Sequence, residues 1–188
     1  MLFRSTSAIS LKANWTRNKK TLTINPSGGV YDGKTTNTTV EVDEGSQYQL
    51  QIPTKENFTF GGWDTNPSSS YNSTTRELTI GTSDITITAK WNNIKRTLTI
   101  DANGGIYEDN KSIVTMEVNQ GEEYSLKTPT KGGFDFDGWT SEPAGVYNSS
   151  TGKITIPASD VTLYAKWKNK VCPSTPTCTQ ALWNRQKH

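Results

Sequence analysis

The residues that most often perform catalysis are scarce in this chain. Among 188 residues there is a single histidine, His188, and it is the last residue. A serine or cysteine nucleophile needs a neighbouring base, which is most often histidine. We therefore expect no Ser–His or Cys–His catalytic centre. One histidine and two cysteines are also too few ligands for a zinc site.

Paired carboxylates are the next chemistry to consider, because two acidic side chains can share acid–base work, as in glycoside hydrolysis. Asp135 and Asp137 lie two residues apart in a predicted strand and therefore share a face. The equivalent positions of the first half of the chain hold Thr59 and Gly61. We interpret the pair as an exposed acidic surface, and we expect the chain not to be an enzyme.

Two further acidic features could bind or cap. Asp84 and Asp160 occupy the same place in the two halves, just before the last strand, where we expect each carboxylate to cap a turn. Residues 101–105 offer two or three oxygen ligands, which is fewer than calcium requires. We therefore expect no metal site and no cofactor.

The two cysteines stand in the last segment of the chain. Cys172 and Cys178 are separated by five residues that are rich in proline and threonine. In an exported protein such a pair closes a small disulfide loop. A disulfide is the expectation, with two free thiols as the alternative, and a C-x-x-C redox motif is absent.

Composition and charge exclude several classes of protein. The chain is 31% hydrophobic, has a net charge of +2 and contains six Trp, seven Tyr and five Phe. Residues 21–93 hold eight acidic and four basic residues, and residues 97–169 hold ten acidic and six basic. Two acidic modules would repel a phosphate backbone, so we expect no nucleic-acid partner. No apolar stretch approaches the ~18 residues of a membrane span.

An internal repeat organises the sequence. Shifting the chain by 76 residues aligns its two halves without a gap. The matching motifs are a T-L-T-I strand, a Gly-Gly turn, a P-T-K segment, an F-x-F-x-G-W motif and a closing A-K-W. In the same order, the aligned residues include Thr21 and Thr97, Gly28 and Gly104, Pro53 and Pro129, Trp63 and Trp139, and Trp91 and Trp167. A fixed period of this length is the signature of a tandem array.

Within one unit the hydrophobic period is two, which is typical of strands. Residues 97–100, 153–156 and 161–167 alternate in this way, and glycine-rich turns separate them. Residues 129–134 could hold one short helical turn capped by Thr130. Large aromatic side chains should anchor the small cores: Trp139, Trp167, Phe134, Phe136 and Tyr147.

Exposed tyrosines are candidates for contacts with a ligand. Tyr31 and Tyr71, with their counterparts Tyr107 and Tyr147, lie beside turns. Aromatic side chains at such places can hold sugar rings, so a carbohydrate-binding module is the alternative function. The basic residues Arg17, Lys19, Lys20, Lys95 and Arg96 stand in the connectors between acidic modules and are candidate polyanion contacts.

The combination of the Gly-Gly turn, P-T-K-x-x-F-x-F-x-G-W and D-[IV]-T-[IL]-x-A-K-W resembles the Listeria–Bacteroides repeat, the internalin-type B repeat of bacterial surface proteins. The resemblance covers residues 20–168 and a strand at residues 9–15 that matches residues 85–91. It implies a mainly β fold (α+β at most), with two tandem β-grasp-like (ubiquitin-like) units of four to five strands. It also implies a bacterial cell-surface or secreted protein.

The expected organisation has four parts. Residues 1–19 carry the last strand of a truncated preceding repeat, residues 20–93 and 94–169 are the two units, and residues 170–188 are a flexible tail. No secretory signal, anchor or membrane insertion is expected within this stretch.

The expected function is a non-catalytic spacer or adhesion segment whose short connectors limit bending. Its partners would be wall polymers, glycosaminoglycans or a host surface protein, besides neighbouring repeats of the same chain.

Overall fold

The computed structural model describes residues 10–68 and 71–171, and these residues form two compact units. Residues up to 56 together with 60–91 make the first unit, and residues 57–59 together with those from 92 onward make the second. The described residues form strands and turns and no helix, as the period-two pattern predicts. They accordingly contain no helix that is long and apolar enough to cross a membrane.

The first unit contains two sheets. One has four strands in the order β2-β1-β7-β4, and the other has three in the order β3-β6-β5. The strands are β1 (Lys19–Asn25), β2 (Thr38–Asp43), β3 (Gln47–Gln49), β4 (Phe58–Asn66), β5 (Tyr71–Asn72), β6 (Glu77–Thr79) and β7 (Ile85–Asn93).

The second unit repeats this arrangement in the orders β11-β14-β8-β9 and β10-β13-β12. Its strands are β8 (Lys95–Asp101), β9 (Ile113–Asn119), β10 (Glu123–Ser125), β11 (Phe134–Glu142), β12 (Tyr147–Asn148), β13 (Lys153–Thr155) and β14 (Val161–Asn169). Seven strands per unit exceed the four or five expected, because strands of two or three residues are too short to show a period.

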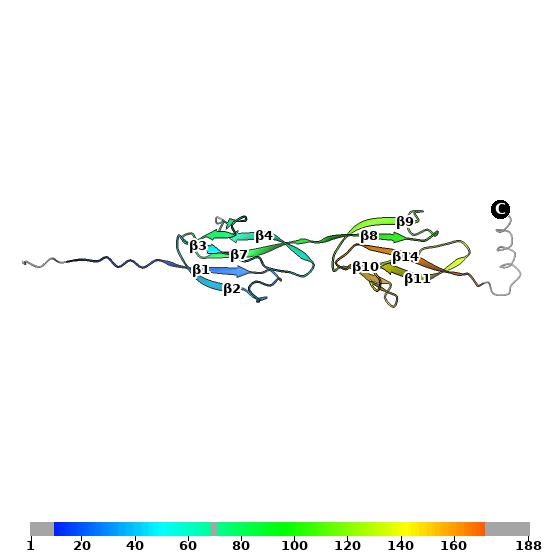
Figure 1. Ribbon diagram of the computed structural model, residues 1–188, viewed down its shortest axis with the longest axis horizontal. Coiled ribbons are helices and arrows are strands. Elements are labelled where there is room, and N and C mark those ends of the chain that lie inside the picture. Colours follow the sequence, from blue (N-terminus) through cyan, green and yellow to red (C-terminus); the bar gives the residue numbers. More distant parts are fainter. Residues whose placement is uncertain (1–9, 69–70, 172–188) are drawn as a thin grey trace, which may run out of the picture. The chain divides into compact units, whose positions relative to one another are not determined.

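The first and last strands of each unit are parallel neighbours. β1 pairs with β7 from Leu22 opposite Ile85 to Asn25 opposite Thr88. β8 pairs with β14 in the same register, from Leu98 opposite Val161 to Asp101 opposite Tyr164. In Figure 1 the blue β1 lies against the green β7, and the green β8 lies against the orange β14. Each unit is thus closed by strands from its two ends.

Each unit has its own hydrophobic core between its two sheets. The alternating strand residues supply it, with Leu22, Ile24 and Ile87 fully buried in the first unit and Leu98, Ile100 and Leu163 in the second. Trp139 is buried as expected, and Phe136, Tyr147 and Trp167 pack against the second core.

Two local expectations are wrong. Phe134 is 38% exposed and lies outside the core, because it stands at the end of the sheet, as the first residue of β11 opposite Asn169, the last residue of β14. Residues 129–134 form no helical turn. Thr130 instead makes an antiparallel bridge with Ile106, which ties this segment to the Gly-Gly turn.

Candidate functional site

The residues shared by both repeats meet around the Gly-Gly turn. In the first unit the Trp91 indole Nε1 donates a hydrogen bond to the Pro26 carbonyl at 3.1 Å. The Lys55 ammonium lies 5.8 Å from the centre of the Trp91 ring and donates to the Ser27 carbonyl at 3.4 Å. A side chain at Gly29 would collide with the Trp91 ring. Only glycine therefore fits beneath the indole.

The second unit forms the same arrangement from its own residues. We call this arrangement, in which a tryptophan and a lysine are hydrogen-bonded to the Gly-Gly turn, the Gly-Gly staple. The Trp167 indole Nε1 donates to the Ala102 carbonyl at 3.0 Å, and the Lys131 ammonium donates to the Asn103 carbonyl at 2.9 Å. A Cβ at Gly105 would lie 2.5 Å from Trp167 Cζ2 and 2.7 Å from the Thr130 carbonyl oxygen. The P-T-K, Gly-Gly and A-K-W motifs thus recur because together they close the fold.

The tryptophans of the F-x-F-x-G-W motif lie at the centre of an aromatic cluster. The Trp63 ring stands edge-on to Tyr31 at 5.8 Å and to Phe60 at 5.3 Å. Trp139 meets Tyr107 and Phe136 at nearly the same distances. Such edge-to-face pairs add stability beyond the burial of their area.

Because of this packing, the tyrosines expected to be exposed are buried or half-buried. Tyr31 is 4% exposed, so the expectation of a surface contact is wrong for it. Its counterpart Tyr107 is half-buried and so are Tyr71 and Tyr147, each packed against a core. The rings of Tyr31 and Tyr107 lie inward as edge-on partners of Trp63 and Trp139, and those of Tyr71 and Tyr147 pack against the hydrophobic cores.

Burial predicts a late component in the alkaline titration of the tyrosines. Desolvation raises the pKa of Tyr31 and of Tyr107 above the ordinary value. A raised pKa means that the folded state favours the neutral phenol. The corresponding stability is fully present below the pKa of the unfolded chain, and it is lost as the pH rises through the pKa of the folded state. Tyrosinate absorbance of a Tyr31→Phe/Tyr107→Phe variant should therefore lose much of the high-pH component, and Tyr71, whose pKa is also raised by burial, should supply the remainder. An unchanged titration curve would contradict this assignment.

Asp84 and Asp160 hold the first strand rather than capping their own turns, which corrects the expectation for them. Asp84 Oδ1 accepts a hydrogen bond from the Thr21 backbone N–H at 2.7 Å. Asp160 Oδ1 accepts one from the Thr97 N–H at 2.8 Å. Each carboxylate lies one residue before the last strand of its unit and extends the parallel ladder by one hydrogen bond.

Removing this acceptor should weaken one unit selectively. Asp160→Ala leaves the Thr97 N–H without its carboxylate, and we expect the second unit to lose about 1 kcal/mol of unfolding free energy. Asp160→Asn retains an oxygen acceptor and should recover part of the loss. Urea unfolding measures both variants, and a midpoint for Asp160→Ala equal to that of the unsubstituted chain would contradict the role.

The basic residues of the first connector, which are candidate polyanion contacts, form ion pairs with neighbouring side chains. Lys19 lies 2.6 Å and Arg17 3.7 Å from Asp43, and Lys20 lies 3.3 Å from Glu44. The hydrogen bond from Lys19, with its charge, lowers the pKa of Asp43. Polyanions would have to compete with these carboxylates.

The same holds for the second connector. Lys95 lies 3.7 Å from Glu117, and the Arg96 guanidinium donates to Gln120 Oε1 at 2.7 Å. Four of the five candidate basic residues thus lie in β1 or β8 and Arg17 precedes β1, and each has a polar or acidic neighbour.

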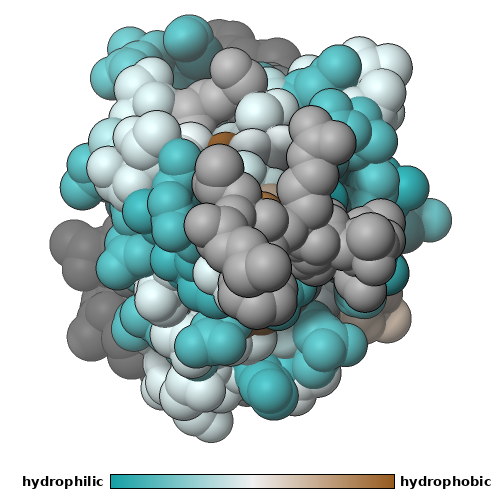
Figure 2. Space-filling view, turned by 90° about the vertical axis from the view of Figure 1, so that its left-hand side faces the viewer, coloured by the Kyte–Doolittle hydropathy of each residue, from teal (hydrophilic) through white to brown (hydrophobic). Residues whose placement is uncertain are grey.

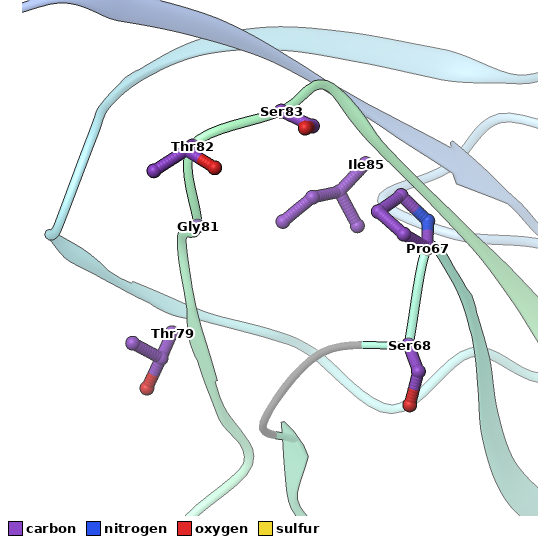
Figure 3. Close-up of a pocket in the computed structure, with 7 residues that line it drawn as sticks. All are labelled: Pro67, Ser68, Thr79, Gly81, Thr82, Ser83 and Ile85. Atoms are coloured by element: carbon purple, nitrogen blue, oxygen red, sulfur yellow. The ribbon is translucent and has the colours of Figure 1, made fainter.

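A shallow hollow lies beside each of the cis prolines Pro67 and Pro143, lined largely by different positions in the two units. In the first unit it is lined by Pro67, Ser68, Thr79, Gly81, Thr82, Ser83 and Ile85. Figure 3 shows the Pro67 ring and the Ile85 side chain close together, with the hydroxyls of Ser68, Thr79, Thr82 and Ser83 around them. In the second unit the hollow is lined by Ser141, Glu142, Pro143, Ala144, Ser159, Asp160, Thr162 and Tyr164. Neither hollow could be predicted from the sequence.

Other chemistry is sparse in the part of the chain that the structure describes. No group of three His, Cys, Asp or Glu side chains there could hold a metal ion. Outside the grey atoms, the face drawn in Figure 2 is mostly hydrophilic or neutral, with small isolated hydrophobic spots. Cys172 and Cys178 lie outside the described residues.

Comparisons with known proteins bear on the repeat. The model of the Listeria-Bacteroides repeat domain matches residues 11–90 and 97–166. Internalin H of Listeria monocytogenes serovar 1/2a (strain ATCC BAA-679 / EGD-e) is 30% identical over 146 residues, which are 76% of this chain. The chain spans about a quarter (25%) of the length of that relative.

A solved structure is also similar, although only weakly. It holds Streptococcal High Identity Repeats in Tandem (SHIRT) domains 3-4 from a cell surface protein, with 16% identity and a TM-score of 0.28. The match covers 81% of this chain and 98% of the other. This similarity is too low to support an inference.

The family model thus matches both halves of the chain, and each match falls on one strand-rich unit with its own Gly-Gly staple. The two units repeat one another in strand order, in register and in the residues that hold the turn. The chain belongs to the Listeria-Bacteroides repeat family and consists of two of its units in tandem.

Proposed function

We propose that the chain is a non-catalytic, load-bearing spacer segment of a bacterial surface protein. Its membership of a repeat family and its two separate cores support this proposal. In a repeat array each unit contributes its own stability, and length grows with the number of units. Such a segment would hold a binding domain away from the cell and transmit tension to it.

The observation that carries the proposal is the parallel pairing of the first and last strands. Tension on an array enters a unit at the start of β8 and leaves at the end of β14. Because these strands are parallel neighbours, the two ends are pulled in opposite directions along one ladder. The backbone hydrogen bonds between them then bear the load together, in shear, instead of opening one at a time.

Other contacts reinforce the same ladder. The Asp160 carboxylate holds Thr97 near the start of β8, and the Trp167 indole of β14 holds the Ala102 carbonyl just beyond the end of β8. Both contacts link the first strand to the last segment of the unit across more than 60 residues of sequence. The first unit has the equivalent pairs.

Pulling a single molecule by its ends tests this function. With handles on the two termini, we expect two separate unfolding events, each releasing roughly 250 Å of chain for about 70 residues at ~3.6 Å per residue. The unfolding rate under load should be slow for both units. Extension without resolved force peaks would exclude a load-bearing role.

A further inference from the structure

The outer face of the second unit carries an aromatic side chain that the first unit lacks. In β14, Val161, Leu163 and Ala165 are buried, so Thr162 and Tyr164 point away from the core. The Tyr164 side chain is 38% exposed although it stands in an inner strand of the sheet. An exposed ring in the middle of a sheet provides a flat apolar surface.

Polar groups surround this ring in the register of the sheet. Thr140 of β11 lies directly opposite Tyr164, and Asp101 of β8 lies beside it on the other side. Glu142 and Thr162 form the next row along the strands. Directly paired residues share a face of the sheet, so hydroxyl and carboxylate groups border the ring on both flanks.

The ring also borders the hollow beside Pro143. Tyr164 and Thr162 line it together with Glu142, Pro143 and Asp160. The tyrosine and proline rings give apolar surface, and the carboxylates are hydrogen-bond acceptors. Asp160 Oδ1 already accepts from Thr97, whereas the Glu142 carboxylate has no hydrogen-bond or ion-pair partner among the residues that the structure describes.

The equivalent face of the first unit is the internal comparison. Its residues at the positions of Tyr164, Glu142 and Ala144 are Thr88, Asn66 and Ser68. The hollow beside Pro67 contains no aromatic or acidic lining residue, and it is lined largely by other positions, among them Thr79, Gly81, Thr82 and Ile85. The outer face of the last strand therefore differs between the units, because the first unit has neither the ring of Tyr164 nor the carboxylate of Glu142.

We propose that the hollow at Tyr164 in the second unit binds an uncharged saccharide. A pyranose ring has an apolar face of C–H groups and a rim of hydroxyls. The apolar face fits the tyrosine ring, whose apolar body and polar tip suit such contacts. The rim hydroxyls can donate to Glu142 and exchange hydrogen bonds with Thr162 and Thr140.

The charges of this face select against acidic saccharides. Asp101, Glu142 and Asp160 surround the ring, while Lys166 is the cation that follows Tyr164 on the same face of β14. Three carboxylates against one ammonium repel a polyanion at close range. The site therefore differs in ligand class from the basic connector residues, and it goes beyond the spacer role.

An NMR titration of the isotopically labelled chain tests the proposal. The probes are unbranched oligosaccharides of β-1,4-linked glucose, β-1,4-linked N-acetylglucosamine and α-linked mannose, with a heparin fragment as the acidic control. At least one neutral probe should shift the amide signals of Thr140, Glu142 and Tyr164 in a saturable way. The signals of Asp64, Asn66 and Thr88 in the first unit should stay in place.

Three variants separate a ring contact from a structural effect. Tyr164→Thr copies the first unit, which folds with threonine at this position, and should weaken binding at least about tenfold. Tyr164→Phe keeps the ring and should retain most of the affinity. Thr88→Ala is the matched control in the first unit and should bind as the unsubstituted chain does.

The opposite results are equally clear. The absence of a saturable shift with all three neutral probes would overturn the proposal, as would equal shifts in both units. Unchanged binding by Tyr164→Thr, or stronger shifts at these residues with heparin, would also overturn it. None of these results bears on the response of the chain to force, so the spacer proposal stands or falls separately.

Discussion

Replacing Gly105 by alanine is expected to destabilise the second unit by about 3 kcal/mol, at the upper end of the usual cost of overpacking. The added Cβ would lie 2.5 Å from Trp167 Cζ2 and 2.7 Å from the Thr130 carbonyl oxygen. Neither neighbour can retreat freely, because the indole is hydrogen-bonded to the Ala102 carbonyl and Thr130 is bridged to Ile106. The clash must therefore break a contact or displace the backbone.

Calorimetry measures this effect, because each unit should melt as its own transition. For a unit of this size, about 3 kcal/mol corresponds to a fall in Tm of about 12 to 24 °C. Gly29→Ala should lower the transition of the first unit in the same way. Gly81→Ala is the control, because its Cβ would meet no atom within 4 Å. If Gly105→Ala lowered the Tm of its unit no more than Gly81→Ala lowers that of its own unit, the proposed role of the Gly-Gly staple in stability would be contradicted.

The second large effect is expected from Trp139→Ala. This side chain is 5% exposed and stands edge-on to Tyr107 and Phe136. Its removal leaves a cavity and costs about 3 to 5 kcal/mol. A domain of about 75 residues is stable by roughly 4 to 11 kcal/mol. The substitution should therefore remove much of the stability of the second unit.

The chain contains its own control for this substitution. Trp15 is 90% exposed, and Trp15→Ala should change the unfolding free energy by less than about 0.5 kcal/mol. Denaturant unfolding of both variants, followed by the fluorescence of the remaining tryptophans, gives the comparison. A loss below about 1 kcal/mol for Trp139→Ala would mean that the aromatic cluster is not the centre of the core.

Local patterns predicted much of the fold. The alternation of residues 97–100 and 161–167 identified β8 and β14, and the 76-residue shift identified the two units. Strand partners separated by 63 residues, such as Leu98 and Val161, leave no local trace. The parallel pairing that closes each unit therefore emerges only in three dimensions.

The same limit explains which site residues were missed. The pattern of recurring tyrosines beside turns predicts surface contacts, but those rings pack against the cores. Tyr164 occurs in one unit only and stands within an alternating strand. The alternation did hold a usable signal, because Tyr164 lies between two residues of the inward-facing set, Leu163 and Ala165. The hollow beside Pro143 depends on the fold and could not be predicted.

The hydrogen-bond partners of Asp84 and Asp160 differ from the predicted ones for a related reason. A carboxylate before a strand is typical of a local turn. Here the carboxylate accepts from a residue 63 positions away, because β1 and β8 begin beside the start of the last strand. Position in the sequence predicted a hydrogen bond but not its partner.

The direction of pulling tests the central claim most directly. In one variant of the chain, cysteines at Asn93 and Lys170 attach the handles near the start of β8 and just after β14. In the other, cysteines at Asn93 and Ser159 attach them near the same ends of both strands. Cys172 and Cys178 are replaced by serine in each. The first geometry loads the β8–β14 ladder in shear, and the second peels it open.

Both variants have the same fold, so a difference in unfolding force reports the geometry of loading alone. The account predicts a several-fold higher unfolding force in the shear geometry than in the peeling geometry. Equal forces in the two geometries would contradict a load-bearing role for the parallel terminal strands.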